Sequence, residues 1–344
     1  MASGQSETCN DDNCTEATTA SGSRAHILYG SRVEHMVSAN ALRVSVIVPF
    51  RNARHQLPAL VDALEQQTCA RELFEVVWID DGSRDDGRAW LSGRVPSSWH
   101  VVGHAASRGS YAARNTGLRV ASGENLAFTD VDCRPQHDWI ERGLASLASV
   151  PRLAGRIQIE LSAAPSTAEL VDAGRFFRQQ RYVEEGFGTT ANLFVRRSVF
   201  DAAGLFDERL RSGGDYEFGL RCSRAGFPIE YAEQVVVKHA ARASIAELLT
   251  KSERVGFGTG QLIRHRGIPI NLLAARFADR VAVARRRGAA ERPLAAPRAS
   301  RSLAVTGLHS LVLLATLAGG LRGFLFPGAA ATHADRRSAR MDTI

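Results

Sequence analysis

The stretch Asn125-Leu-Ala-Phe-Thr-Asp130-Val-Asp132-Cys133 joins a short apolar run to two carboxylates at positions i and i+2. The apolar run predicts a buried strand, which Pro135 ends. Because side chains alternate along a strand, both carboxylates would lie on the same side of the chain. Ligands of open α/β sheets bind at the carboxyl ends of the strands, and two carboxylates there suit a hard divalent cation that holds a diphosphate. A loop with two solvated acids is the alternative from these residues alone.

Strands and helices alternate in the chain before this stretch. The expected strands cover residues 42–50, 74–79 and 100–103, and the expected helices cover residues 52–67, 85–95 and 108–118. This order predicts an α/β fold with a Rossmann-like, mostly parallel sheet flanked by helices. Asp80, Asp81 and Gly82 directly follow the second strand, so they form either a turn at the ligand edge or an ordinary helix-capping turn.

The chain after Asp132 predicts further strands and helices. Helices are expected over residues 139–150, 166–185, 199–204 and from 213 on, and strands over residues 153–161, 189–197, 228–232 and 235–237. Asp215 falls in the first turn of a helix, where the helix dipole favours a carboxylate, so a simple N-cap is one reading of it. His239 follows the last strand, where a single histidine is more often structural than a ligand.

Composition is that of a globular protein, with 44% apolar and 23% charged residues in 344. The formal charge is +7, and Lys238 and Lys251 are the only lysines. Arginines crowd between Arg276 and Arg301, which indicates either a solvated helix face or contact with anionic lipid headgroups. Nucleic-acid binding is disfavoured because no aromatic residues are interleaved with the central run Arg285-Arg286-Arg287. The five cysteines follow neither a disulfide framework nor zinc spacing, which favours a reducing cytoplasm.

An uncharged stretch of 19 residues, Leu303 to Leu321, is just long enough to span a bilayer. The arginines before it would place the rest of the chain on the cytoplasmic face of the cell membrane. A buried or interfacial helix competes with a span, because His309 and several Gly, Ser and Thr residues weaken the hydrophobicity. The predicted segments are a disordered start (1–40), a catalytic unit (41–265), a basic helical linker (266–302), a hydrophobic helix expected to be a membrane segment (303–326), and a polar tail (327–344).

Seven short motifs together resemble the family 2 glycosyltransferases, which have the GT-A fold. They are Val44-Ser-Val-Ile-Val-Pro-Phe-Arg-Asn52, Ile79-Asp-Asp-Gly-Ser83, Ala113-Arg-Asn-Thr-Gly117, Phe128-Thr-Asp-Val-Asp132, Asn192-Leu-Phe-Val-Arg-Arg197, Gly204-Leu-Phe-Asp207 and Gly214-Asp215-Tyr-Glu-Phe-Gly-Leu-Arg221. Each motif is weak by itself, but their order and spacing over residues 42–240 make the resemblance specific.

The resemblance implies an inverting transfer of a sugar from a nucleotide-sugar, often UDP-linked, to a hydroxyl group, with Mn²⁺ or Mg²⁺ as cofactor. Donor-nucleotide contacts would come from Pro49, from Asp80 or Asp81 at the base, from Arg114 near the phosphates, and from Asp130 near the ribose.

The resemblance also implies roles in metal binding and catalysis. Asp132 would bind the metal, His239 would supply a further ligand, and Asp215 would be the general base. The family often has Glu-Asp at the base motif where this chain has Gly214-Asp215, which leaves the acceptor side open; Glu217 is a conceivable substitute.

The acceptor implied is a saccharide, a lipid or a small molecule in polysaccharide, glycolipid or metabolite glycosylation. Two alternatives stay open: a nucleotidyltransferase, and a degenerate sugar-nucleotide-binding scaffold. The first needs a phosphate loop that Pro49-Phe-Arg-Asn52 does not resemble.

Overall fold

The computed structural model describes residues 43–269 and 298–328 of the chain, all within one unit that spans residues 40–344. The predicted disordered start, most of the basic linker and nearly all of the polar tail lie outside the described residues.

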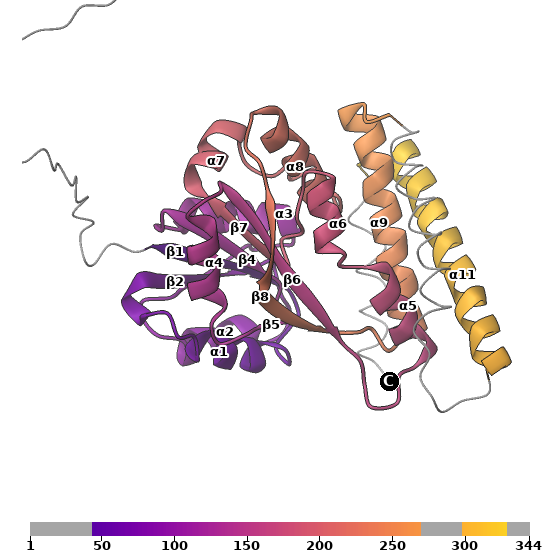
Figure 1. Cartoon of the computed structure of the whole chain (residues 1–344), viewed down its shortest axis with the longest axis horizontal. Helices are drawn as coiled ribbons and strands as arrows, with labels where there is room; N and C mark the ends of the chain where they lie inside the picture. The colour runs from indigo at the N-terminus through magenta and orange to yellow at the C-terminus, as the bar shows by residue number, and fades with distance from the viewer. Residues whose placement is uncertain (1–42, 270–297, 329–344) are drawn as a thin grey trace, which may run out of the picture. The chain divides into compact units, whose positions relative to one another are not determined.

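An eight-stranded sheet forms the centre of the fold (Figure 1). Its strands are β1 (Val44–Phe50), β2 (Phe74–Asp80), β3 (His100–Gly103), β4 (Asn125–Thr129), β5 (Cys133–Pro135), β6 (Arg152–Glu160), β7 (Asn192–Arg196) and β8 (Glu230–Ala240). They lie in the order β3-β2-β1-β4-β7-β6-β8-β5. The half formed by β3, β2, β1 and β4 is parallel, whereas β7 runs antiparallel to both β4 and β6, and β5 antiparallel to β8. The predicted α/β fold is confirmed, with a mixed sheet beyond β4.

Helices cover both faces of this sheet. They are α1 (Leu57–Glu65), α2 (Gly87–Arg94), α3 (Ser110–Val120), α4 (Trp139–Leu147), α5 (Thr167–Arg175), α6 (Gln179–Glu184), α7 (Arg197–Ala203), α8 (Gly214–Arg224), α9 (Ile245–Arg266) and α11 (Arg298–Leu325). Residues of β1 alternate between two apolar cores: Val46 and Val48 pack with α1, α2 and α4, and Ile47 packs with α3, α7 and α8. Burial on both faces explains why β1 is apolar except at Ser45, whose hydroxyl donates a hydrogen bond to Glu75.

Three element predictions were wrong in detail. The strand expected to be ended by Pro135 ends at Thr129, and Pro135 is the last residue of the separate strand β5. The helix expected over residues 166–185 is divided into α5 and α6, because Phe177 between them has a φ of +59°, which no α-helix contains. The two strands expected between residues 228 and 237 form the single strand β8, which carries an irregularity opposite Gly155 and Arg156.

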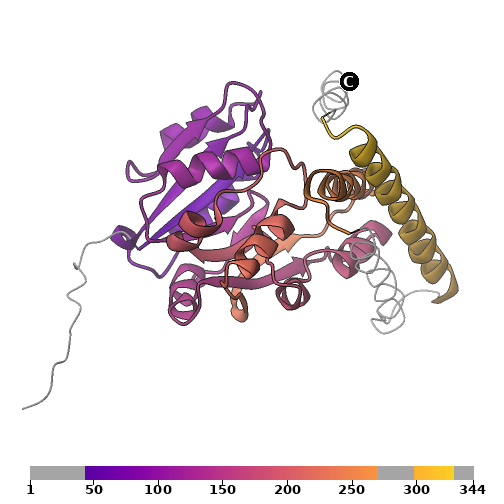
Figure 2. The same cartoon turned by 90° about the horizontal axis from the view of Figure 1, so that it is seen from above.

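Helices α9 and α11 lie side by side, as both views of the chain show (Figure 1, Figure 2). Glycines at four-residue spacing form the contact: Gly256 and Gly260 on α9, and Gly319 and Gly323 on α11. A Cβ on any of the four would overlap backbone of the other helix. The two backbones therefore touch directly, in the way that small residues at this spacing allow. Helix α11 begins at Arg298, five residues before the predicted hydrophobic segment.

Candidate active site

A cavity of about 730 Å³ opens at the carboxyl ends of β1 and β4. Its lining includes seven of the eight residues that the sequence marked: Pro49, Asp81, Arg114, Asp130, Asp132, Asp215 and His239. They come from the end of β1, the residue after β2, helix α3, the chain after β4, the start of α8 and the end of β8. The parallel strands bring their carboxyl ends to one edge, which explains why residues so far apart in sequence meet there.

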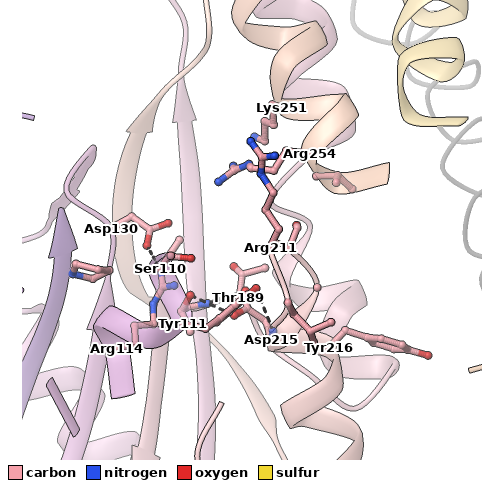
Figure 3. A pocket seen from close by; sticks show the side chains of 18 of the residues that line it. Ser110, Tyr111, Arg114, Asp130, Thr189, Arg211, Asp215, Tyr216, Lys251 and Arg254 are labelled. Carbon is pink, nitrogen blue, oxygen red and sulfur yellow. Dashed lines mark hydrogen bonds and ion pairs between the residues drawn. The ribbon is translucent and has the colours of Figure 1, made fainter. Parts of the chain in front are cut away.

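Asp130 is bound by Arg114 at one wall of the cavity (Figure 3). Arg114 Nη2 lies 2.6 Å from Oδ1 of Asp130, and the arginine is buried while one third of the aspartate side chain is exposed. A charge-assisted hydrogen bond this short fixes both side chains. Asp130 thus presents its remaining acceptor positions to the cavity from a fixed orientation.

Asp132 and His239 approach each other on the next part of the wall. His239 Nε2 lies 3.1 Å from Oδ2 of Asp132, and Arg242 Nη2 lies 4.0 Å from the same oxygen. Burial raises the pKa of Asp132, but the hydrogen bond and charge of His239 and the charge of Arg242 lower it further, so the net pKa is well below the usual range. Asp132 is therefore ionised at neutral pH.

These two side chains fit a divalent cation. Ligands at right angles and about 2.1 Å from a cation lie about 3.0 Å apart, close to the observed separation of Oδ2 and Nε2. The described residues hold no cluster of three or more Asp, Glu, His or Cys side chains for a metal. Mg²⁺ and similar ions often take only one or two protein ligands and complete their shell with phosphate oxygens and water. The pair thus suits a cation that is shared with a bound diphosphate.

Asp215 faces the cavity from the first turn of α8 (Figure 3). Its carboxylate does not cap its own helix: it accepts weak hydrogen bonds from the backbone nitrogen (3.4 Å) and Oγ1 (3.3 Å) of Thr190. Burial raises the pKa of Asp215 to about 6; the positive charge of Arg114 opposes this shift and the negative charge of Asp130 adds to it. A carboxylate with this pKa is ionised at pH 7 yet basic enough to take a proton.

Tyr111 holds the start of α8 in place. Its hydroxyl oxygen accepts hydrogen bonds from the backbone nitrogens of Gly214 (2.9 Å) and Asp215 (3.4 Å). Gly214 has no room for a side chain, because a Cβ there would meet the Tyr111 ring at 2.6 Å. This contact gives a physical reason for glycine at position 214.

Asp81 lines the cavity, but the loop of residues 104–109 uses both of its oxygens. Oδ1 accepts from Nδ1 of His104 (2.9 Å) and the nitrogen of Arg108 (2.8 Å), and Oδ2 accepts from Oγ of Ser107 (2.7 Å) and the nitrogen of Gly109 (2.9 Å). Burial raises the pKa of Asp81, and these hydrogen bonds, led by that of Ser107, lower it below the ordinary value. Four accepted hydrogen bonds occupy all the lone-pair sites of a carboxylate, so Asp81 has none left for a ligand. Asp80 is buried in the turn and accepts from the nitrogen of Ser83 (2.8 Å).

Glu217 is held away from the cavity by ion pairs with Arg221 (2.8 Å) and Arg266 (3.1 Å), so it does not take the place of the missing glutamate. Sequence reasoning missed Tyr111, Thr190, Phe177 and Lys251, all of which line the cavity. Only Lys251 carried a signal, as one of two lysines in an arginine-rich chain.

Comparison with known proteins shows the family of the chain. The family model described as Glycosyl transferase family 2 matches residues 45–203. Glycosyltransferase AglE of Haloferax volcanii is 33% identical over 225 residues, which are 64% of this chain and 73% of that protein. The pre-mycofactocin glycosyltransferase of Mycobacterium tuberculosis is 26% identical over 234 residues, which are 64% of this chain and 48% of that protein.

A solved structure shares the fold. Mannosyltransferase PcManGT from Pyrobaculum calidifontis, in complex with GDP-Man and Mn²⁺, has a TM-score of 0.56 at 19% identity and covers 84% of this chain and 89% of its own. The fold, the motifs and the relatives agree. The chain is a glycosyltransferase and belongs to glycosyl transferase family 2.

Proposed function

We propose that this glycosyltransferase moves a sugar from a nucleotide diphosphate-sugar to a hydroxyl group in one displacement, with inversion and with Asp215 as the general base. The observation that carries the proposal is that Asp132 and Asp215 line the same cavity, from the end of the central strand β4 and from the start of α8. A one-step displacement needs charge stabilisation at the leaving diphosphate and a base near the incoming hydroxyl.

Asp215 performs the proton transfer in this proposal. It takes the proton of the acceptor hydroxyl as the oxygen attacks the anomeric carbon, and it later returns that proton to solvent. A positioned base of this kind contributes roughly 10²–10⁴ in rate. The two hydrogen bonds from Thr190 orient the carboxylate, and they are weak enough to leave acceptor positions for a hydroxyl.

Asp132 and His239 would hold the divalent cation, Mn²⁺ or Mg²⁺, which supplies electrostatic stabilisation of the leaving diphosphate. Arg114 and Asp130 bind and orient the nucleotide part of the donor as one fixed pair. Pro49 and the 104–109 loop form the end of the cavity expected to receive the base.

The proposal includes both uracil and guanine as the nucleobase of the nucleotide-sugar donor. The expectation of UDP relied on a free carboxylate at Asp80 or Asp81, whereas the oxygens of Asp81 are occupied by the 104–109 loop. The fold neighbour PcManGT is itself in complex with GDP-Man and Mn²⁺. A screen of donors therefore has to include both nucleotide classes.

We further propose that the outer face of α11 lies on a membrane surface. Leu311, Leu314, Leu317, Leu321 and Leu325 are between 52% and 61% exposed and fall on one face of the helix. Helix α11 meets the length and hydropathy of a span over Gly307–Leu325, with 28% of that segment buried. Its inner face, however, is packed on α9, and Arg322 forms an ion pair with Glu253 of that helix.

This packing favours a helix in the plane of the membrane over a helix across it. A span would carry the ionised residues of α9, including Glu253 and Arg254, towards the bilayer centre, at a cost of several kcal/mol for each. The arginines between Arg276 and Arg301 in the sequence suit anionic headgroups, as on the cytoplasmic face of a cell membrane. An acceptor in glycolipid or surface-polysaccharide synthesis would be within reach there.

Donor binding tests the enzymatic proposal. UDP- and GDP-sugars are titrated by calorimetry into the wild type and into Asp132→Asn, with and without Mn²⁺, and Asp62→Asn on the exposed face of α1 serves as control. The wild type and the control should bind one donor class in a Mn²⁺-dependent way, and Asp132→Asn should lose at least tenfold in affinity. Equal Mn²⁺-dependent binding by Asp132→Asn would remove Asp132 from the metal site.

Sedimentation with vesicles tests the membrane proposal. Vesicles with phosphatidylglycerol should carry down the wild type, and alkaline carbonate should release it, as expected for a surface helix. Leu314→Glu with Leu321→Glu should abolish the binding, whereas Arg224→Gln on α8 should not. Resistance to carbonate would point to a span, and undiminished binding of the double variant would exclude this face.

A further inference from the structure

The ring of Phe177 lies between His239 and Lys251 in the lining of the cavity. Its centroid lies 4.6 Å from that of His239 and 4.3 Å from Nζ of Lys251. The backbone of Phe177 is in the left-handed region, with a φ of +59°, which is rare and costly for a bulky residue. The turn between α5 and α6 thus places one aromatic ring against the candidate metal ligand and against a buried cation.

Three cations converge beyond this ring: Lys251 and Arg254 on α9, and Arg211 in the loop before α8 (Figure 3). We call them the cationic cluster. Lys251 is 8% exposed, and its Nζ also lies 3.8 Å from the centroid of Phe176. Arg254 forms no ion pair within residues 43–269 and 298–328. Arg211 precedes the candidate base Asp215 by only four residues, so the cluster borders the acceptor side of the cavity.

Among the residues that the structure describes, the carboxylates that act on Lys251 and Arg211 are Asp172, Asp132 and Glu253, and each of these also has another cationic partner. Asp172 lies 3.5 Å from Nζ of Lys251, but it also pairs with Arg242 at 3.4 Å. Glu253 is engaged by Arg322. Burial, with the charge of Arg242 added, lowers the pKa of Lys251 to about 7. Holding several cations together in a partly dehydrated cavity costs free energy unless an anion joins them.

We propose that the cationic cluster binds a phosphate group of the acceptor, on the far side of Phe177 from the metal site. This inference rests on the proposed function, because it assigns the acceptor to the Asp215 side of the cavity. Two arginines and a lysine offer forked and single N–H donors suited to phosphate oxygens. The donor diphosphate already has its place at Asp132 and His239, so the cluster serves a second anion. The acceptor class is therefore a hydroxyl compound with a phosphate ester.

The test uses the full chain with its nucleotide-binding site occupied. Protein saturated with Mn²⁺ and the nucleoside diphosphate it binds best is titrated with glucose 6-phosphate and, separately, with dodecyl phosphate below its micelle concentration. Wild type should bind at least one of them. Lys251→Met and Arg254→Gln should each weaken that binding tenfold or more and leave nucleotide affinity within twofold. Arg264→Gln, an exposed arginine of α9 outside the cavity lining, is the matched control and should bind like wild type.

The two ligands distinguish the source of the phosphate. Equal binding of both indicates a soluble phosphate ester, and binding of dodecyl phosphate alone indicates a lipid phosphate. Failure of wild type to bind either, or binding that both variants retain, overturns the inference while nucleotide binding continues to support the proposed function. Because Arg254 is exposed, Arg254→Gln gives a clear result even if Lys251→Met does not fold. Loss of nucleotide binding by wild type itself would instead count against the proposed function.

Discussion

Arg114 Nη2 lies 2.6 Å from Oδ1 of Asp130, while Asp132, two residues on, pairs with His239 instead. The two carboxylates that look equivalent in the sequence thus have different partners. One is held by a permanent cation, and the other by a histidine at a separation that suits a divalent metal. In the proposed mechanism, this difference assigns nucleotide orientation to Asp130 and metal binding to Asp132.

The charges of Arg114 and Asp130 should set the pKa of the proposed general base, Asp215. The charge of Arg114 lowers the pKa of Asp215 and that of Asp130 raises it. Arg114→Gln should therefore move the acidic limb of the pH profile of kcat/KM upward from about 6, and Asp130→Asn should move it downward, each by roughly half a unit or more. Shifts in the same direction, or no shift, would show that neither charge acts on the base.

Asp215 should reduce the stability of the folded chain at neutral pH. Its pKa is raised on folding from 3.8 to about 6, so its contribution to stability is complete below pH 4 and is lost as the pH rises through 6. Asp215→Asn, which cannot ionise, should melt roughly 2–4 °C above wild type at pH 7.5 and close to it at pH 4. Differential scanning calorimetry measures this. The exposed Asp62→Asn serves as the surface control, and a lower melting temperature for Asp215→Asn at pH 7.5 would contradict the raised pKa.

Asp81 should act as the anchor of the 104–109 loop. Asp81→Asn turns one acceptor oxygen into a donor facing Ser107 or backbone N–H groups, and each unsatisfied buried group costs about 1–3 kcal/mol. We expect a lower melting temperature together with weaker nucleotide binding, measured by scanning fluorimetry and calorimetry. If nucleotide affinity fell with no loss of stability, the anchoring role would be contradicted, and Asp81 would instead bind the nucleobase of the donor directly.

The glycine contact between α9 and α11 should tolerate no added methyl group. Alanine favours a helix over glycine by about 1 kcal/mol, so Gly307→Ala, at a site with open space, should keep or raise the melting temperature. Gly256→Ala would push a Cβ into the carbonyl oxygen of Thr316 and should lower it. Equal melting temperatures for the two variants would show that the helices do not pack in this way.

The parallel half of the sheet and the cavity edge were predictable because local patterns determine them. The nearly continuous apolar run of β1 and the carboxylates after β4 indicate burial and strand direction without knowledge of distant contacts. The break at Phe177 was not predictable, since no glycine or proline marks its positive φ. The hydrogen bonds of Asp81 and the position of Lys251 depend on segments about 25 and 80 residues away, which only the folded chain brings together.

The account depends most on Asp215 as the base that faces a donor held at Asp132. The direct test compares donor affinity, by calorimetry with Mn²⁺, and the rate of sugar transfer to a hydroxyl acceptor or to water in wild type and Asp215→Asn. The account predicts donor affinity within about twofold and turnover lower by roughly 10²–10⁴. Turnover within tenfold of wild type, at unchanged donor affinity, would contradict it.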